Sequence, residues 1–176
     1  GYQLQTRFVG DQSAAIWSLA RTSAGATLEP DKTTDALLLS ICGEGVSDSF
    51  DHGIAALTKA GRLILDQDPT FVSGGFMSFY ESAEPAPAWW TEAKDLYAKA
   101  MGEFYRANTR ARDGARPLIL RYAKRATFAL HYVTAAEAAR KAGIAKAAGD
   151  DDARIESLEL AIESMHNALA IYAEVA

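Results

Sequence analysis

The pair Glu163 and His166 is the part of the sequence that most resembles a metal site, because the two residues lie three apart on one predicted helix. Dinuclear carboxylate sites in helical bundles use two such Glu-x-x-His motifs and two further glutamates, all pointing inward. This chain has one such motif. On a helical wheel Glu163 lies well away from the apolar stripe and His166 only flanks it. We therefore predict no bound metal and interpret the two residues as surface charges.

The other residues with catalytic chemistry do not form a recognisable set. His52 follows Asp51, but adjacent residues on a helix face different directions, so Asp51 is badly placed to orient the imidazole. The three histidines are scattered, and the single cysteine, Cys42, lies in a leucine-rich segment typical of a buried thiol. The glycine turn at 43–45 lacks the lysine and the preceding strand of a phosphate-binding loop. We expect no catalytic residue and no cofactor site in this chain.

The segment from 69 to 90 is the part most suggestive of binding. It combines prolines and paired glycines with aromatic side chains, and three glutamates lie close by in the sequence. Aromatic faces beside carboxylates suit sugars, whose C–H faces stack on rings and whose hydroxyls donate to carboxylates. The candidate substrate-contact residues are Phe76, Phe79, Tyr80, Trp89 and Trp90. The same side chains would fill a core or a domain interface, and we favour that interpretation because large aromatic residues are mostly buried.

Length and composition indicate one soluble domain. The chain has 176 residues, of which 49% are hydrophobic and 23% charged, and its formal net charge is −5. This acidic balance argues against nucleic acid as a partner, although basic residues concentrate between 106 and 146. Apolar runs are shorter than the roughly 20 residues of a membrane helix, so we expect no membrane partner. A single cysteine excludes an internal disulfide and leaves the compartment open.

Three long helices are predicted over residues 88–111, 116–142 and 150 onwards. Gly143 follows the predicted end of the second, and the run Asp150-Asp151-Asp152 suits the N-terminus of the third. Each helix has an apolar stripe, and the loops between them are short, which predicts an antiparallel up-down-up bundle. In the last helix the stripe expected to face the core comprises Ile155, Leu158, Ile162, Met165, Leu169 and Tyr172.

The middle helix of these three carries apolar side chains on two sides. Leu120 and Phe128 lie on its back, away from its main stripe, and are candidate interface residues. We expect the shorter N-terminal helices or another domain to cover this second face. The basic flank of the middle helix and the acidic residues of the last one predict complementary charges between packed neighbours.

The first part of the chain predicts shorter helices. One covers about 11–21, a leucine-rich helix includes 36–41, and a third runs from a serine cap at Ser47 or Ser49 to the stop at Asp68-Pro69. Residues 2–9 alternate weakly, as in a strand, but nothing nearby could pair with them.

The expected fold is therefore all-α, an antiparallel bundle of three long helices packed against a layer of shorter N-terminal helices. It forms a single domain over 1–176, in which the shorter helices occupy 1–68, an aromatic, proline- and glycine-rich loop occupies 69–87, and the bundle occupies 88–176. The chain starts without methionine and ends in a helical pattern without a stop signal. We expect it to be cut from a longer protein.

Several short sequence motifs follow one another along the chain. They are Ala15-Ile16-Trp17-Ser18-Leu19-Ala20, Leu28-Glu29-Pro30-Asp31, Asp35-Ala36-Leu37-Leu38, Gly43-Glu44-Gly45 and Pro85-Ala86-Trp89-Trp90 before a tyrosine-rich helix. This order resembles the helical region that follows the catalytic (β/α) barrel in some bacterial glycoside hydrolases. In this chain Ile41-Cys42-Gly43 stands where that region usually has Tyr-Tyr-Gly. The resemblance implies a carbohydrate-active parent protein whose catalytic acids lie in the barrel, so no catalytic residue is carried over to this chain.

Two functions of different classes follow from the sequence. In the first, the chain is a non-catalytic accessory domain of a multidomain glycoside hydrolase, which braces the catalytic domain of the same polypeptide and lends its aromatic loop to the carbohydrate cleft. In the alternative, it is a free-standing helical protein–protein interaction module. A complete enzyme has the least support, because no nucleophile, base or metal set can be assembled from these residues.

Overall fold

The computed structural model describes residues 19–24, 33–72 and 75–175. These residues form helices and the turns between them, and none of them lies in a strand. The predicted all-α fold class is confirmed. The predicted strand at 2–9 lies outside the described residues, as does most of the predicted first helix, of which residues 19–23 are helical.

The long helices form at the predicted places. In chain order the elements are α2 (Thr33–Cys42), α3 (Ser47–Gln67), α4 (Met77–Glu81), α5 (Ala88–Arg110), the 3-10 helix η3 (Asp113–Ala115), α6 (Arg116–Ala148) and α7 (Asp151–Val175). The short helix α4 interrupts the segment expected to be a loop. The predicted serine cap of α3 is wrong, because Val46 occupies the cap position and no side chain bonds the free amides there.

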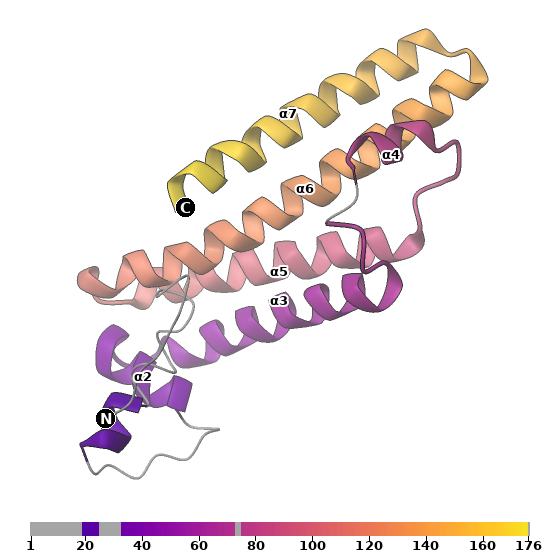
Figure 1. Ribbon diagram of the computed structural model, residues 1–176. Helices are drawn as coiled ribbons and strands as arrows, with labels where there is room; N and C mark the ends of the chain where they lie inside the picture. Colours follow the sequence, from indigo (N-terminus) through magenta and orange to yellow (C-terminus); the bar gives the residue numbers. More distant parts are fainter. Residues whose placement is uncertain (1–18, 25–32, 73–74, 176) are drawn as a thin grey trace.

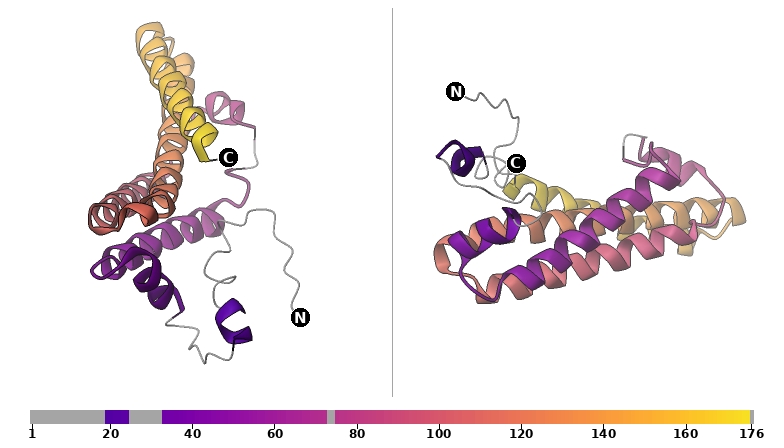
Figure 2. Two further views of the ribbon diagram at one scale, coloured as in Figure 1. Left: turned by 90° about the vertical axis from the view of Figure 1, so that its left-hand side faces the viewer. Right: turned by 90° about the horizontal axis from the view of Figure 1, so that it is seen from below.

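The helices are arranged as a row in which each long helix packs against the next. α3 packs against α5, α5 against α6, and α6 against α7, while α4 lies on α6 (Figure 1). Further views show α7 and α3 at opposite ends of this row (Figure 2). The second face of α6 was expected to meet the shorter N-terminal helices or another domain. In the described residues α7 packs on α6, and Phe128 of this face contacts Tyr172 of α7. Of the N-terminal helices, α3 packs on α5, whereas α2 contacts η3 and α3.

Two apolar clusters hold the row together. The first joins α2, α3, α5 and α6 around Phe50 and Phe104, whose ring centroids lie 5.4 Å apart in an edge-to-face contact. The second joins α3, α5, α6 and Ala161 of α7 to the 71–90 segment around Phe71, Trp90 and Val133. Edge-to-face aromatic pairs stabilise a core beyond the contribution of the apolar surface that they bury. Both clusters contain residues of α5 and α6, so they fix the position of α6 on α5.

α6 is longer than predicted because its glycine at 143 does not end it. The helix continues to Ala148 and ends at Gly149, whose φ of 73° is the left-handed conformation typical of a helix C-terminus. Gly143 is buried within the helix, at a place where a β-carbon would lie 2.3 Å from the carbonyl oxygen of Tyr80. Gly143, which was expected to end the helix, therefore allows α6 to approach the C-terminal end of α4 closely, because it has no side chain.

The start of α7 agrees with the prediction, whereas its buried face does not. The Asp150 carboxylate accepts a hydrogen bond from the Ala153 N–H at 3.0 Å and so caps the helix. The residues of α7 that become buried are small: Ala161, Ser164 and Ala168. In the described part of the chain α6 is the one helix that packs extensively on α7, and buried alanines at 135, 138, 142 and 145 recur along α6. Two faces lined by small side chains allow the two backbones to approach closely.

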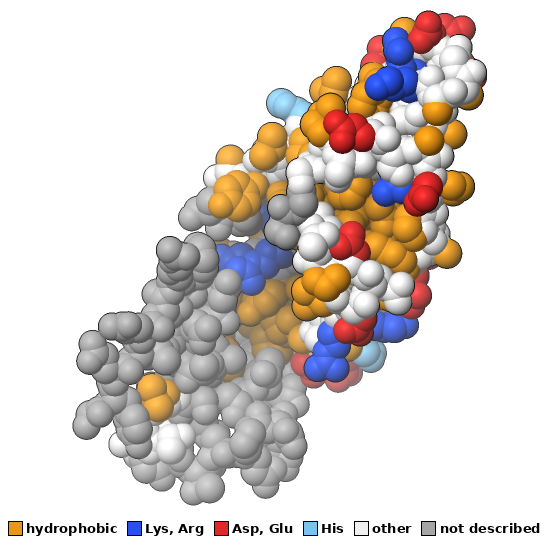
Figure 3. All heavy atoms as spheres, turned by 45° about the vertical axis from the view of Figure 1, so that its right-hand side comes forward, with side chains coloured by type: hydrophobic (Ala, Val, Ile, Leu, Met, Phe, Trp, Pro, Cys, Tyr) orange, Lys and Arg blue, Asp and Glu red, His pale blue; other side chains and the backbone are white. Residues whose placement is uncertain are grey.

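The larger apolar side chains of α7 remain at the surface. We name this set the outer seam; its members are Ile155, Leu158, Ile162, Met165, Leu169 and Tyr172. Ile162 is 69% exposed and Leu169 is 58% exposed, while Leu158 and Met165 are half-buried. Hydrophobic side chains are visible along this part of the surface (Figure 3). The prediction that this stripe faces the core is wrong, because α6 selects the adjacent, small-residue face.

Candidate functional site

Phe71 is the centre of an aromatic cluster. Its ring contacts the rings of Phe79, Trp89, Trp90 and Tyr132 with centroid distances between 5.2 and 5.7 Å. Three of these four contacts are edge-to-face, the geometry that aromatic quadrupoles favour. The Phe71 carbonyl also accepts a hydrogen bond from the Tyr132 hydroxyl at 3.3 Å. The cluster therefore fixes the segment after α3 on α5 and α6.

The structure brings four of the five candidate substrate-contact residues together in this cluster. Phe79 and Trp90 are buried, whereas Phe76 and Trp89 are half-buried at its rim. The fifth, Tyr80, is half-buried elsewhere, with its ring centroid 4.9 Å from the Lys146 ammonium nitrogen. Partial exposure leaves Phe76, Tyr80 and Trp89 with ring surface available to a ligand.

The glutamates predicted beside these rings are not gathered around them. Glu81 and Glu84 are exposed, and Glu92 forms an ion pair with Lys59 at 3.1 Å. The Arg140 guanidinium lies over the buried Trp90 ring, 5.4 Å from its centroid. Arg140 also donates a hydrogen bond to the Glu84 carbonyl oxygen at 3.3 Å. These two contacts of Arg140 hold the 71–90 segment against α6, and we interpret them as structural contacts of the core.

The residues with metal or nucleophile chemistry lie apart. Glu163 and His166 are both exposed on α7, and the described residues contain no group of three or more ligand-type side chains that could hold a metal ion. Cys42 is buried, and burial raises the pKa of its thiol, which disfavours the reactive thiolate. Gly43 and Gly45 have φ of 86° and 81°, so the glycine turn joins α2 to α3 as predicted.

Glu137 is the centre of a half-buried charge group between α5 and α6. Its carboxylate pairs with Lys94 of α5 and, at 3.0 Å, with Lys141 one turn further along α6. Burial acts to raise the pKa of this carboxyl group, but the hydrogen bonds and charges of the two lysines outweigh burial and hold the pKa below its ordinary value of 4.5. The group is a structural ion pair that joins the two helices.

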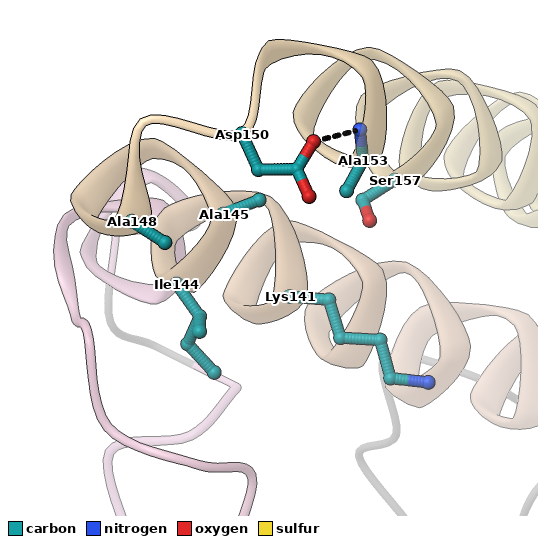
Figure 4. Close-up of a pocket in the computed structure, with 7 residues that line it drawn as sticks. All are labelled: Lys141, Ile144, Ala145, Ala148, Asp150, Ala153 and Ser157. Atoms are coloured by element: carbon teal, nitrogen blue, oxygen red, sulfur yellow. Dashed lines mark hydrogen bonds between the residues drawn. The ribbon is translucent and has the colours of Figure 1, made fainter.

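A hollow of about 320 Å³ lies at the turn between α6 and α7. Aliphatic atoms of Ile144, Ala145, Ala148 and Ala153 line most of it. In Figure 4 the Asp150 carboxylate points to the Ala153 amide that it caps, and the Lys141 side chain extends away from the carboxylate. The two charged groups therefore do not converge on the hollow.

A groove of about 340 Å³ runs beside α7, and we name it the α7 groove. Its lining residues are Phe76, Ala161, Ile162, Met165, His166 and Leu169. Three of them belong to the outer seam, and Phe76 forms the opposite wall. Sequence reasoning selected Phe76 but assigned the three seam residues to the core, so it missed this site. The sequence of α7 does carry a signal for this site, because small residues (Ala161, Ser164, Ala168) each precede a large apolar one and so form a second, adjacent face of the helix.

The two candidate interface residues of α6 are half-buried. Phe128 stacks on Tyr132 with centroids 6.3 Å apart and contacts Tyr172 of α7 at 6.1 Å. Lys124 on the same face forms an ion pair with Glu174, and this pair is one instance of the predicted charge complementarity. Phe128 therefore lies at the contact between α6 and α7.

Comparison with known proteins places the chain in no family. No family model matches it, and neither a curated protein nor a solved structure was found to be similar. Among the described helices, none has the length and apolarity required to cross a membrane.

Proposed function

We propose that this chain is a non-catalytic helical domain that acts by binding another protein surface. The observation that carries the proposal is the outer seam of α7, where large apolar side chains lie in solvent beside the α7 groove. Contiguous exposed apolar surface of this kind marks interaction sites in soluble proteins, whereas single exposed apolar residues are ordinary.

The chemistry of the described residues supports binding over catalysis. The groups with shifted pKa values are the buried thiol, the buried Tyr97, the half-buried Tyr122 and Tyr132, Arg125 and the ion-paired Glu137. Desolvation shifts the tyrosine hydroxyls and Arg125, and no two of these groups form an acid and base pair around a cavity. Enzymes place perturbed groups together in a cleft.

A narrower form of this proposal makes the chain an accessory domain of a carbohydrate-active enzyme, which packs on the catalytic domain of the same polypeptide. Its support is the order of sequence features described above and the ring surface left open on Phe76, Tyr80 and Trp89. The test is the fluorescence of the tryptophans during titration with oligosaccharides. Quenching that is lost in Trp89→Ala and kept in the exposed control Tyr105→Ala supports this form, and a flat titration removes it.

Thiol labelling tests the interaction function itself. Ile162→Cys introduces an exposed thiol on the outer seam, and Cys42 contributes little background because it is buried. The matched control is Glu163→Cys, an exposed position outside the seam. In living cells maleimide should label position 162 at least about tenfold more slowly than in the dilute purified protein, with position 163 unchanged. Equal labelling of both positions in cells would remove the proposed function.

A further inference from the structure

The outer seam has the spacing of a coiled coil. Ile155, Ile162 and Leu169 recur every seven residues, and Leu158, Met165 and Tyr172 follow each of them by three. These are the a and d positions of a heptad repeat, with branched aliphatic side chains at every a position. A helix with this repeat buries its seam against a partner helix with the same repeat, because each side chain then inserts between four residues of its neighbour.

Within the chain, α6 contacts this seam at Tyr172, whose ring centroid lies 6.1 Å from that of Phe128, and leaves Ile155, Ile162 and Leu169 exposed. α6 packs against the alanine and serine face, which lies one residue back along the helix and so about 100° around it. The heptad seam therefore stays open beside α6, and Phe76 forms a second wall along it. From these observations we infer that two copies of this chain associate by packing their α7 helices against each other, antiparallel, through the outer seam. This inference rests on the proposed interaction function and names its partner.

The antiparallel arrangement makes the seam complementary to itself. In that arrangement an a residue of one helix shares a layer with a d residue of the other. Ile162 meets Met165 of the second copy, Leu158 meets its Leu169, and Ile155 meets its Tyr172. Each layer recurs by the two-fold axis, as a closed symmetric dimer requires. The inner layers pair apolar side chains, and the hydroxyl of Tyr172 lies in the outermost layer, at the edge of the seam where water can reach it.

Charge also favours the antiparallel arrangement. α7 begins with Asp151 and Asp152, and Glu156 and Glu159 follow within the next turns. α6 begins beside the end of α7, as the Lys124–Glu174 ion pair shows, and it carries the exposed Arg116 and Arg121 in its first turns. An antiparallel dimer brings the acidic start of one α7 toward the basic start of the other α6. A parallel dimer would place two acidic helix starts, with aligned helix dipoles, side by side.

Sedimentation velocity of the whole chain between about 1 and 500 µM tests the association. We expect a dimer that the double change Ile162→Glu with Leu169→Glu converts to a monomer, with a dissociation constant at least about 100-fold higher. Both side chains are exposed in the single chain, so circular dichroism and the unfolding temperature at low concentration should stay unchanged. The control is Leu160→Glu, the same chemical change at an exposed leucine outside the seam. It should leave the dimer intact.

Disulfide trapping tests the orientation. When Ile155→Cys and Tyr172→Cys proteins are mixed and oxidised, the antiparallel dimer gives a covalent heterodimer, and neither protein alone gives a covalent homodimer. Covalent homodimers of each variant would overturn the orientation. A monomer at all concentrations, or a dimer that survives the double change, would overturn the self-association. If position 162 remains protected from labelling in cells while the purified chain is monomeric, the interaction function stands and its partner is another protein.

Discussion

The α-carbon of Gly143 lies against the backbone at the C-terminal end of α4. A β-carbon at this position would be 2.3 Å from the carbonyl oxygen of Tyr80 and 2.7 Å from that of Ser82. Backbone atoms cannot move aside as a flexible side chain can. Tyr80 is the penultimate residue of α4, and this close approach is what holds α4 against α6.

The first prediction follows from this approach. Gly143→Ala should lower the free energy of unfolding by about 3 kcal/mol, because the added methyl group must displace backbone. An ordinary helical glycine gives the opposite sign. Gly102→Ala, in α5 with open space around it, should raise stability by about 0.5–1 kcal/mol. Chemical denaturation of both variants measures the difference, and equal effects would show that the approach is not tight.

The second prediction compares Phe71, at the centre of the aromatic cluster, with its exposed neighbour in the sequence, Val72. Phe71 is 1% exposed and Val72 is 68% exposed. Phe71→Ala should cost about 3–5 kcal/mol, because it leaves a cavity among four aromatic rings. Val72→Ala should change stability by less than about 0.5 kcal/mol. Thermal unfolding measures both, and a small loss at Phe71 would mean that the cluster does not hold the segment in place.

The third prediction concerns acid. Because the pKa of the folded Glu137 carboxyl group lies below its ordinary value of 4.5, its ionised form stabilises the fold above that value, and the stabilisation is lost as pH falls through the folded pKa. Glu137→Gln should therefore lower stability at pH 7 and flatten the dependence of stability on pH below about 4.5. The control is Glu92→Gln, whose ion pair is exposed and contributes little. Urea unfolding at several pH values gives both curves.

The fourth prediction concerns the contact between α6 and α7. Ala168→Leu should cost about 1–3 kcal/mol, because Ala168 is fully buried on the small-residue face. Ala170→Leu makes the same change at an exposed position of α7 and should have little effect. The comparison uses urea unfolding at a concentration where the chain is monomeric. Similar stabilities would show that α7 is held by a different face.

Much of the fold could be predicted from the sequence because its helix ends carry local signals. α5 ends within one residue of its predicted end, and α7 starts at the run of aspartates whose charge predicted a helix N-terminus. These signals act over a single turn, so they need no knowledge of the tertiary neighbours. Two helix-end predictions failed, the serine cap of α3 and the stop at Gly143. The failure at Gly143 has a tertiary cause, since the backbone it contacts is 61 residues or more earlier in the chain.

The candidate site could not be predicted because hydrophobicity alone does not decide which face of a helix is buried. α7 has one face with large side chains and an adjacent face with small ones, and the larger face has the greater transfer free energy. The alanine-lined surface of α6 nevertheless requires a small-residue neighbour for close packing, and this requirement is a property of the pair. Hydrophobicity alone therefore assigns Ile162 and Leu169 to the core, although both are more than half exposed on α7.

In the described residues α7 packs on the rest of the chain along one side, through α6. How often this helix detaches therefore depends on what binds its other side. A layer at the end of a row opens without disrupting the Phe50–Phe104 cluster, which contains no residue of α7. Amide hydrogens between Ala161 and Ala168 should then exchange with solvent before those of α5. Any protein that occupies the vacant side binds only the closed form, so it would slow this exchange in proportion to its concentration. Because α7 packs on α6 through one alanine-lined side, a bound partner on its other side would increase the rigidity of the C-terminal end.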